Sequence, residues 1–133
     1  MFSHVMIGTR DLARARRFYD AVLGRIGIEP GTLDTGTAGQ QRVVYRHGGQ
    51  TFFVTEPLHD GSVAPANGST LAFRCASTEE VYAFHHMALH HGGVAIEDAP
   101  GLRQRPTGPV VLAYVRDLDG HKLAAVFRPT TVR

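Results

Sequence analysis

The sequence is poor in features that would place it in a membrane or an oxidising compartment. It contains one cysteine, Cys75, and no tryptophan. A single cysteine rules out an internal disulfide framework and fits a reducing cytoplasm. No apolar run approaches the roughly 20 residues needed to span a bilayer, and residues 1–5 lack the basic and apolar regions of a secretory signal. We therefore expect a cytoplasmic protein with no membrane partner.

Neither sign of charge dominates, because the formal net charge is only +2. One dense basic cluster is present, and neither an aromatic platform nor a recognised nucleic-acid motif accompanies it. We interpret this cluster as the solvated face of an amphipathic helix, and nucleic acid is not the expected partner. Nucleophile-elbow and phosphate-loop motifs are also absent. The cluster consists of Arg10, Arg14, Arg16 and Arg17.

The composition is that of an ordinary globular protein. Of the 133 residues, 43% are hydrophobic and 20% are charged. A chain of this length buries a normal core without disulfides or metals. Residues 1–133 are therefore expected to form a single domain.

The first half begins with an extended apolar run over residues 4–9, followed by a helical pattern. Asp11 is a plausible N-cap of this helix, and Gly24 a plausible end. Apolar residues recur at spacings of three and four, which predicts one buried helix face. These residues are Leu12, Ala15, Phe18, Tyr19, Val22 and Leu23.

The same order of features recurs 66 residues later. Residues 70–75 form a second short apolar run, and Ser77 with Glu80 forms a capping box. An apolar stripe follows, and Gly92 and Gly93 close it. The 66-residue offset superposes Phe18 on Phe84, and the match indicates an internal repeat. The stripe consists of Val81, Phe84, Ala88 and Leu89.

Further strands follow each helix, so each half has the pattern βαβββ. We predict strands at about 42–46 and 51–55, and at about 110–116 and 122–128. An additional short strand is expected in each half, near 27–29 and 94–97. The fold class is α+β: module 1 (about 1–57) and module 2 (about 70–129), joined by a linker (about 57–69), form a cupped mixed sheet. The cleft between them is the usual place for a small ligand.

Three segments of the sequence resemble the vicinal oxygen chelate superfamily, which comprises glyoxalases, bleomycin resistance proteins and dioxygenases. These segments are residues 4–12, 17–24 and 114–124. The resemblance implies paired βαβββ modules, a homodimer with modules paired within or between chains, and one divalent cation in the cleft. In such enzymes, His, Glu or Gln from the first and last strands of each module hold the cation, which acts as a Lewis acid.

The positions that the resemblance assigns to the metal are only partly filled by donors. His4 lies at the first position, and Glu56 or its neighbours Phe53 and Thr55 at the second. Thr70 occupies the third position, and Ala124, which has no donor atom, the fourth. Since a catalytic site commonly keeps three protein ligands, we expect an incomplete metal site with His4 and Glu56 as its candidate ligands.

The leading hypothesis is a binding protein for a small, anionic organic ligand, with no cofactor. Arg74 shares a strand face with Thr70 and Ala72 and could bind a carboxylate or phosphate. The alternative is a metal-dependent glyoxalase-like lyase or extradiol-type dioxygenase that uses His4, Glu56 and a further ligand such as His121. A drug-sequestering resistance protein ranks third, because a basic surface disfavours a cationic drug. The expected cleft residues are His4, Met6, Phe53, Thr55, Thr70, Ala72, Arg74, Tyr114 and Ala124.

Overall fold

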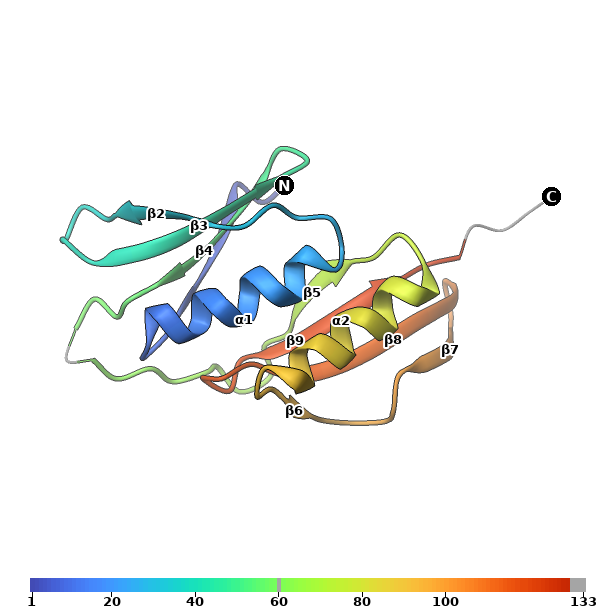
Figure 1. Ribbon diagram of the computed structural model, residues 1–133. Coiled ribbons are helices and arrows are strands. Elements are labelled where there is room, and N and C mark those ends of the chain that lie inside the picture. The colour runs from blue at the N-terminus through green and yellow to red at the C-terminus, as the bar shows by residue number, and fades with distance from the viewer. Residues whose placement is uncertain (60, 130–133) are drawn as a thin grey trace.

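The computed structural model describes residues 1–59 and 61–129 (Figure 1). Helices and strands are mixed, and the expected α+β class is confirmed. Neither helix, each 13 residues long, is long and apolar enough to cross a membrane. The first module contains β1 (His4–Gly8), α1 (Leu12–Gly24), β2 (Thr32–Thr35), β3 (Gln41–His47) and β4 (Gln50–Thr55). The second contains β5 (Leu71–Arg74), α2 (Thr78–His90), β6 (Val94–Ala95), β7 (Gly101–Arg105), β8 (Gly108–Arg116) and β9 (Lys122–Phe127).

The two sheets repeat one topology. The first has the strand order β1-β4-β3-β2, and the second has the order β5-β9-β8-β6 with β7 also paired to β8. In each module the first strand pairs in parallel with the last strand, which pairs in antiparallel fashion with the strand before it. The internal repeat predicted from the 66-residue offset is therefore present in the backbone.

Both helices begin at the predicted caps. The Asp11 side chain accepts a hydrogen bond from the Arg14 amide at 3.1 Å. Ser77 accepts one from the Glu80 amide at 3.1 Å. The Glu80 carboxylate accepts from the amide of Ala76, one residue before the cap, at 2.7 Å. These bonds satisfy amide groups that a helix start leaves without partners.

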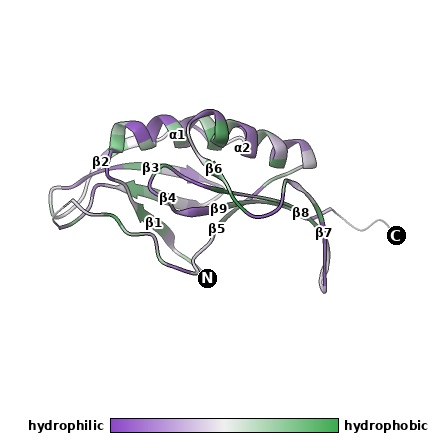
Figure 2. Cartoon of the chain, turned by 90° about the horizontal axis from the view of Figure 1, so that it is seen from below, coloured by the Kyte–Doolittle hydropathy of each residue, from purple (hydrophilic) through white to green (hydrophobic). Residues whose placement is uncertain are grey.

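The core lies between the helices and one face of the sheets. Figure 2 shows both helices on the same side of the two sheets, and α1 contacts α2. The predicted stripe residues Phe18, Val22 and Phe84 are at most 1% exposed, whereas Leu89 is 39% exposed. The prediction that Leu89 is buried was therefore wrong: at the last turn of α2 it lies beyond the edge of the packed face.

Of the two predicted short strands, the first is displaced and the second is shorter than predicted, and one further strand was missed. Residues 27–29 do not form a strand, because the chain is still bound to the end of α1. The Ile28 amide donates to the Leu23 carbonyl at 3.1 Å, and Gly27 has a φ of +85°. The strand begins only at Thr32, while the one near residue 94 is confined to Val94–Ala95. β7 adds a further strand to module 2.

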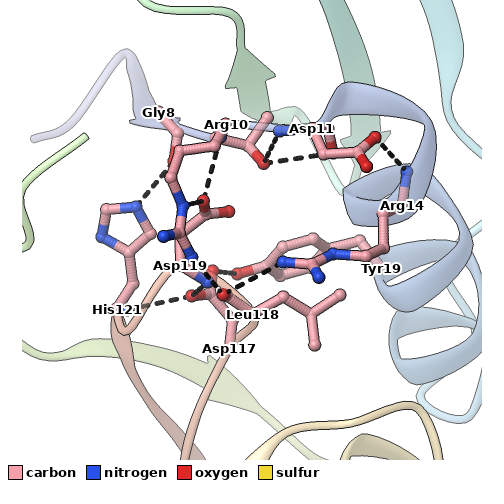
Figure 3. Close-up of polar contacts among 10 residues, drawn as sticks. Gly8, Arg10, Asp11, Arg14, Tyr19, Asp117, Leu118, Asp119 and His121 are labelled. Carbon is pink, nitrogen blue, oxygen red and sulfur yellow. Dashed lines mark hydrogen bonds and ion pairs between the residues drawn. The ribbon is translucent and has the colours of Figure 1, made fainter. Parts of the chain in front are cut away.

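The hairpin between β8 and β9 is anchored in module 1 by a buried carboxylate (Figure 3). Asp117 Oδ2 accepts the Tyr19 hydroxyl at 2.5 Å, and its Oδ1 accepts the amides of Asp119 at 3.0 Å and His121 at 2.9 Å. Burial raises the pKa of Asp117 above its ordinary value. The three donors offset part of the cost of burying this charge.

Asp119 and His121 extend this network to the segment between β1 and α1. Asp119 Oδ1 accepts from the backbone amide of Arg10 at 2.9 Å and from its Nε at 3.0 Å. His121 Nε2 donates to the Gly8 carbonyl at 2.7 Å. Because these bonds join residues more than 100 positions apart, they fix the end of β8 and β9 against module 1.

We predict that Asp119→Asn lowers the free energy of unfolding by about 1–3 kcal/mol at pH 7. Burial alone would raise the pKa of Asp119, but hydrogen bonds from Thr9 and Arg10 outweigh it and hold the pKa below its usual value. A depressed folded-state pKa contributes stability above the unfolded value of about 3.9, and this is lost as pH falls through the folded value. The destabilisation should therefore shrink at pH about 3. Urea unfolding of the variant and the unmodified chain, at pH 7 and at pH about 3, measures the change in the free energy of unfolding.

Asp98→Asn is the matched control, since Asp98 is exposed. Its effect should be within about 0.5 kcal/mol at either pH. Equal losses for Asp119→Asn at the two pH values would contradict the role assigned to the ionised carboxylate.

Candidate functional site

The side of the sheets that the helices leave uncovered is called here the helix-free face. Strand alternation defines it, because Val5, Ile7 and Phe73 pack into the core on the helix side. His4, Met6, Ala72 and Arg74 therefore point to the opposite side. By the strand registers, the same face carries Arg42, Val44, Arg46, Phe53, Thr55, Leu112, Tyr114, Arg116, Lys122, Ala124 and Val126.

In module 1 this face is built around Phe53. The His4 ring meets Phe53 edge-on, with ring centroids 5.4 Å apart. The guanidinium of Arg42 lies 4.7 Å from the centroid of the same ring. Arg42 Nε also donates to Asp34 at 2.7 Å, and this hydrogen bond holds the pKa of Asp34 below its usual value. Phe53 is thus an apolar surface bordered by two basic side chains.

In module 2 an apolar row crosses the face. Ala72 pairs with Ala124 and Ala124 with Tyr114, so the three lie side by side on neighbouring strands. Ala124 is only 2% exposed and packs in a small cluster that includes Tyr114. The Lys122 ammonium lies 4.6 Å from the centre of the Tyr114 ring and pairs with Glu97. Arg74 lies two residues beyond Ala72 on β5 and is exposed.

Thr70 lines a hollow that we call the loop hollow. It has a volume of about 530 Å³ and lies where the segment between the modules passes the end of β5, β8 and β9. By register, Lys122 pairs with Arg116 across the closing hairpin. The residues that line it are Pro65, Ala66, Asn67, Gly68, Ser69, Thr70, Arg116, Gly120 and Lys122.

Glu56 and Thr55 lie away from His4. His4 pairs with Thr51 at one end of β4, whereas Glu56 follows the other end, a separation of five residues or roughly 16 Å along the strand. Glu56 Oε1 accepts from the Gln41 amide at 2.7 Å, and Glu56 lines a second hollow, of about 430 Å³, beside Leu12 and Arg16 on the helix side. The structure therefore does not bring together His4 and Glu56, the two candidate metal ligands.

The residues present do not fit the divalent cation that the resemblance implies. Within residues 1–59 and 61–129, no group of three or more His, Cys, Asp or Glu side chains could hold a metal ion. Thr70 and Ala124 occupy the remaining assigned positions, and alanine supplies no donor. Nε2 of His121 is already bonded to Gly8. A catalytic site commonly keeps three protein ligands, so we derive no step through a metal.

Sequence reasoning missed the basic residues that the hairpin brings together. None of Arg116, Lys122 and Arg42 is among the expected cleft residues. Positions 116 and 122 flank the predicted turn at residues 117–120 and face the same side of an antiparallel hairpin, so strand parity alone could have identified the pair. Nothing in the sequence indicates that residues 65–70 line this hollow, because their position depends on the contact between Pro65 and Gly120.

The chain is similar to a known family and to solved structures. The sequence profile of the Glyoxalase/Bleomycin resistance protein/Dioxygenase superfamily matches residues 1–125. A glyoxalase/bleomycin resistance protein from Albidiferax ferrireducens T118 is 42% identical, with a TM-score of 0.88 and coverage of 96% of this chain and 99% of that one. No curated protein matches the chain.

More distant structures share the fold alone. The genomically encoded fosfomycin resistance protein FosX from Listeria monocytogenes is 17% identical, with a TM-score of 0.66 and coverage of 100% of this chain and 94% of that one. A glyoxalase-related enzyme from Fulvimarina pelagi is 21% identical, with a TM-score of 0.67 and coverage of 97% and 89% respectively.

We predict that the purified chain binds less than about one equivalent of divalent metal after dialysis against a mixture of zinc, manganese and nickel. The physical reason is that His4 has no second side-chain donor from the assigned set beside it. Elemental analysis measures the metal, and His4→Ala should leave the content unchanged. One tightly held equivalent that disappears in His4→Ala would show that the donor set has been misjudged.

Proposed function

Because the chain belongs to the glyoxalase/bleomycin resistance protein/dioxygenase superfamily, we propose that it binds a small organic anion on the helix-free face. One observation carries the proposal: basic side chains gather on this face. The two carboxylates that the described contacts place beside them, Asp34 and Glu97, are each paired with a cation. The basic residues are His4, Arg42, Arg46, Arg74, Arg116 and Lys122.

Apolar side chains on the same face suit the carbon part of such a ligand. Ala72, Ala124 and Tyr114 form one row, with Arg74 on one side and Lys122 on the other. Phe53 and the exposed Met6 provide a second apolar area in module 1. Ligand sites commonly combine an apolar lining with a few polar groups that fix orientation. The exposed Ala72 and the partly exposed Tyr114 flank the buried Ala124 in this row.

The cations would act by binding and orienting the ligand. An arginine such as Arg74 donates two parallel hydrogen bonds to a carboxylate or phosphate, and its charge does not titrate near neutral pH. A lysine acts as a point charge. A metal-dependent lyase or dioxygenase is less well supported, since His4 and Glu56 lie apart, and a drug-sequestering protein for cations is disfavoured by the charge of the face.

We also propose that the protein is a homodimer, as the resemblance implies. Among the described strands, β1 bonds only to β4 and β5 only to β9, so each has a free edge. Met6, on β1, is 39% exposed. Free strand edges and exposed apolar side chains favour association with a second copy.

Light scattering coupled to size-exclusion chromatography tests the dimer, with an expected mass of about twice the 14.5 kDa of one chain. Met6→Lys should shift the population towards monomer, because it places a charge on the exposed surface. Leu102→Lys is the matched control, since Leu102 is exposed on β7, in the other module. A monomer at all concentrations would remove this part of the proposal.

For the ligand, we predict that some carboxylates or phosphates in a thermal-shift screen raise the melting temperature by roughly 4 °C for each kcal/mol of binding linkage. Arg74→Ala should reduce the shift, because it removes a basic group beside the apolar row. Arg105→Ala removes an exposed arginine at the end of β7 and should preserve the shift. If no member of either chemical class stabilises the protein, anion binding is not its function.

A further inference from the structure

The loop hollow is shaped by a close approach of two segments. A Cβ atom at Gly120 would lie 3.2 Å from Cγ of Pro65, so the linker packs tightly against the turn between β8 and β9. The linker then turns back, with the Ser69 amide donating to the Ala66 carbonyl at 3.1 Å and Gly68 at a φ of +93°. Ser69 and Thr70, which each carry a hydroxyl group, are among the lining residues.

Two basic residues line the hollow, and the charge of each is held by a different partner. Arg116 Nη1 donates to the Gly120 carbonyl at 2.8 Å, and a guanidinium carries four further N–H donors. Lys122 has its side chain 24% exposed and lies over the Tyr114 ring. Because the two residues are register partners, their charges lie on the same side of the hairpin.

Glu97 is the group with which a bound anion would compete. Its carboxylate pairs with Lys122 and its side chain is 46% exposed. Among the described residues, it is also the only non-glycine residue with a positive φ, at 62°. Surface ion pairs are weak, so an oxyanion that meets Lys122 and Arg116 together can replace or share this single contact.

We propose that the loop hollow is an oxyanion subsite that holds the carboxylate or phosphate end of the ligand. The subsite rests on the proposed function, because it assigns a position to the charged end of the anion that the helix-free face is proposed to bind. Lys122 and Arg116 neutralise the charge, while the hydroxyls of Ser69 and Thr70 donate hydrogen bonds. The carbon part then lies over Tyr114 and Ala72, on either side of the buried Ala124, and leads towards Arg74.

The other basic positions are less suited to this role. Arg42 is already bonded to Asp34 and lies flat on Phe53. The second hollow contains Arg16 and Arg17, but Glu56 and the apolar residues Leu12 and Leu33 also line it. The loop hollow combines two cations with hydroxyl groups and has no carboxylate among its lining residues.

Amide chemical shifts locate the site directly. The ¹⁵N-labelled full-length chain is titrated with inorganic phosphate and, separately, with acetate, at constant ionic strength and pH. We expect saturable shifts at the amides of residues 66–70 and of Gly120. A stronger response to phosphate identifies a phosphorylated ligand class, and a stronger response to acetate a carboxylate class.

Variants test the two cations and their competitor. Lys122→Met keeps the stem against Tyr114 and removes the charge, and it should raise the Kd for the titrated anion about tenfold, as should Arg116→Met. Glu97→Gln should lower the Kd about threefold, because it frees Lys122 from a surface ion pair. Arg105→Met is the charge-matched control and should leave the Kd unchanged. Superposable spectra without anion establish that each variant is folded.

The outcomes separate this inference from the proposed function. Saturable shifts confined to Arg42, Arg46, Phe53 or Arg74 would overturn the subsite while leaving anion binding on the helix-free face intact. An unchanged Kd in Lys122→Met and Arg116→Met would also overturn the subsite. No saturable shift with either anion overturns it too, and in that case the thermal-shift screen of organic anions decides the proposed function independently.

Discussion

The buried hydrogen bond between Tyr19 and Asp117 joins the first helix to the closing hairpin, and much of the molecule depends on this junction. Placing a carboxylate among core residues costs free energy unless donors surround it. Tyr19 and two backbone amides supply those donors. Without the Tyr19 hydroxyl, Oδ2 of Asp117 would lose the donor described for it, and a buried acceptor left unsatisfied is costly. The hairpin is therefore held in one position relative to module 1.

That position determines where the basic groups of module 2 lie. The turn that Asp117 anchors also carries Gly120, whose carbonyl orients Arg116 and whose surface contacts Pro65. Lys122 begins the strand that leaves the same turn. A hydrogen-bond network on the helix side thus fixes the position of the basic residues that line the loop hollow on the other side.

The fold alone does not define the chemistry of the helix-free face. Structures at 17% and 21% identity share this arrangement of helices and strands, and a shared fold can carry unrelated functions. In this chain, alanine and threonine stand at positions 124 and 70, and cations lie over the aromatic rings of Phe53 and Tyr114. These side chains are the basis of the proposal that the face binds an anion.

The sequence by itself determined the repeat, both helix caps and the longer strands, because capping, amphipathic spacing and strand alternation act between residues close in the chain. The sequence also assigned His4 and Arg74 to the same side of their sheets, since the alternation of side chains along a strand involves only neighbouring residues. Only the tertiary structure decided that Leu89 is exposed, that β7 extends the second sheet, and that Glu56 lies on the helix side. It alone revealed the hollow beneath Pro65. Those features depend on how segments distant in sequence approach one another. A change of one residue in a strand register, or in the residue at which a helix ends, is enough to alter them.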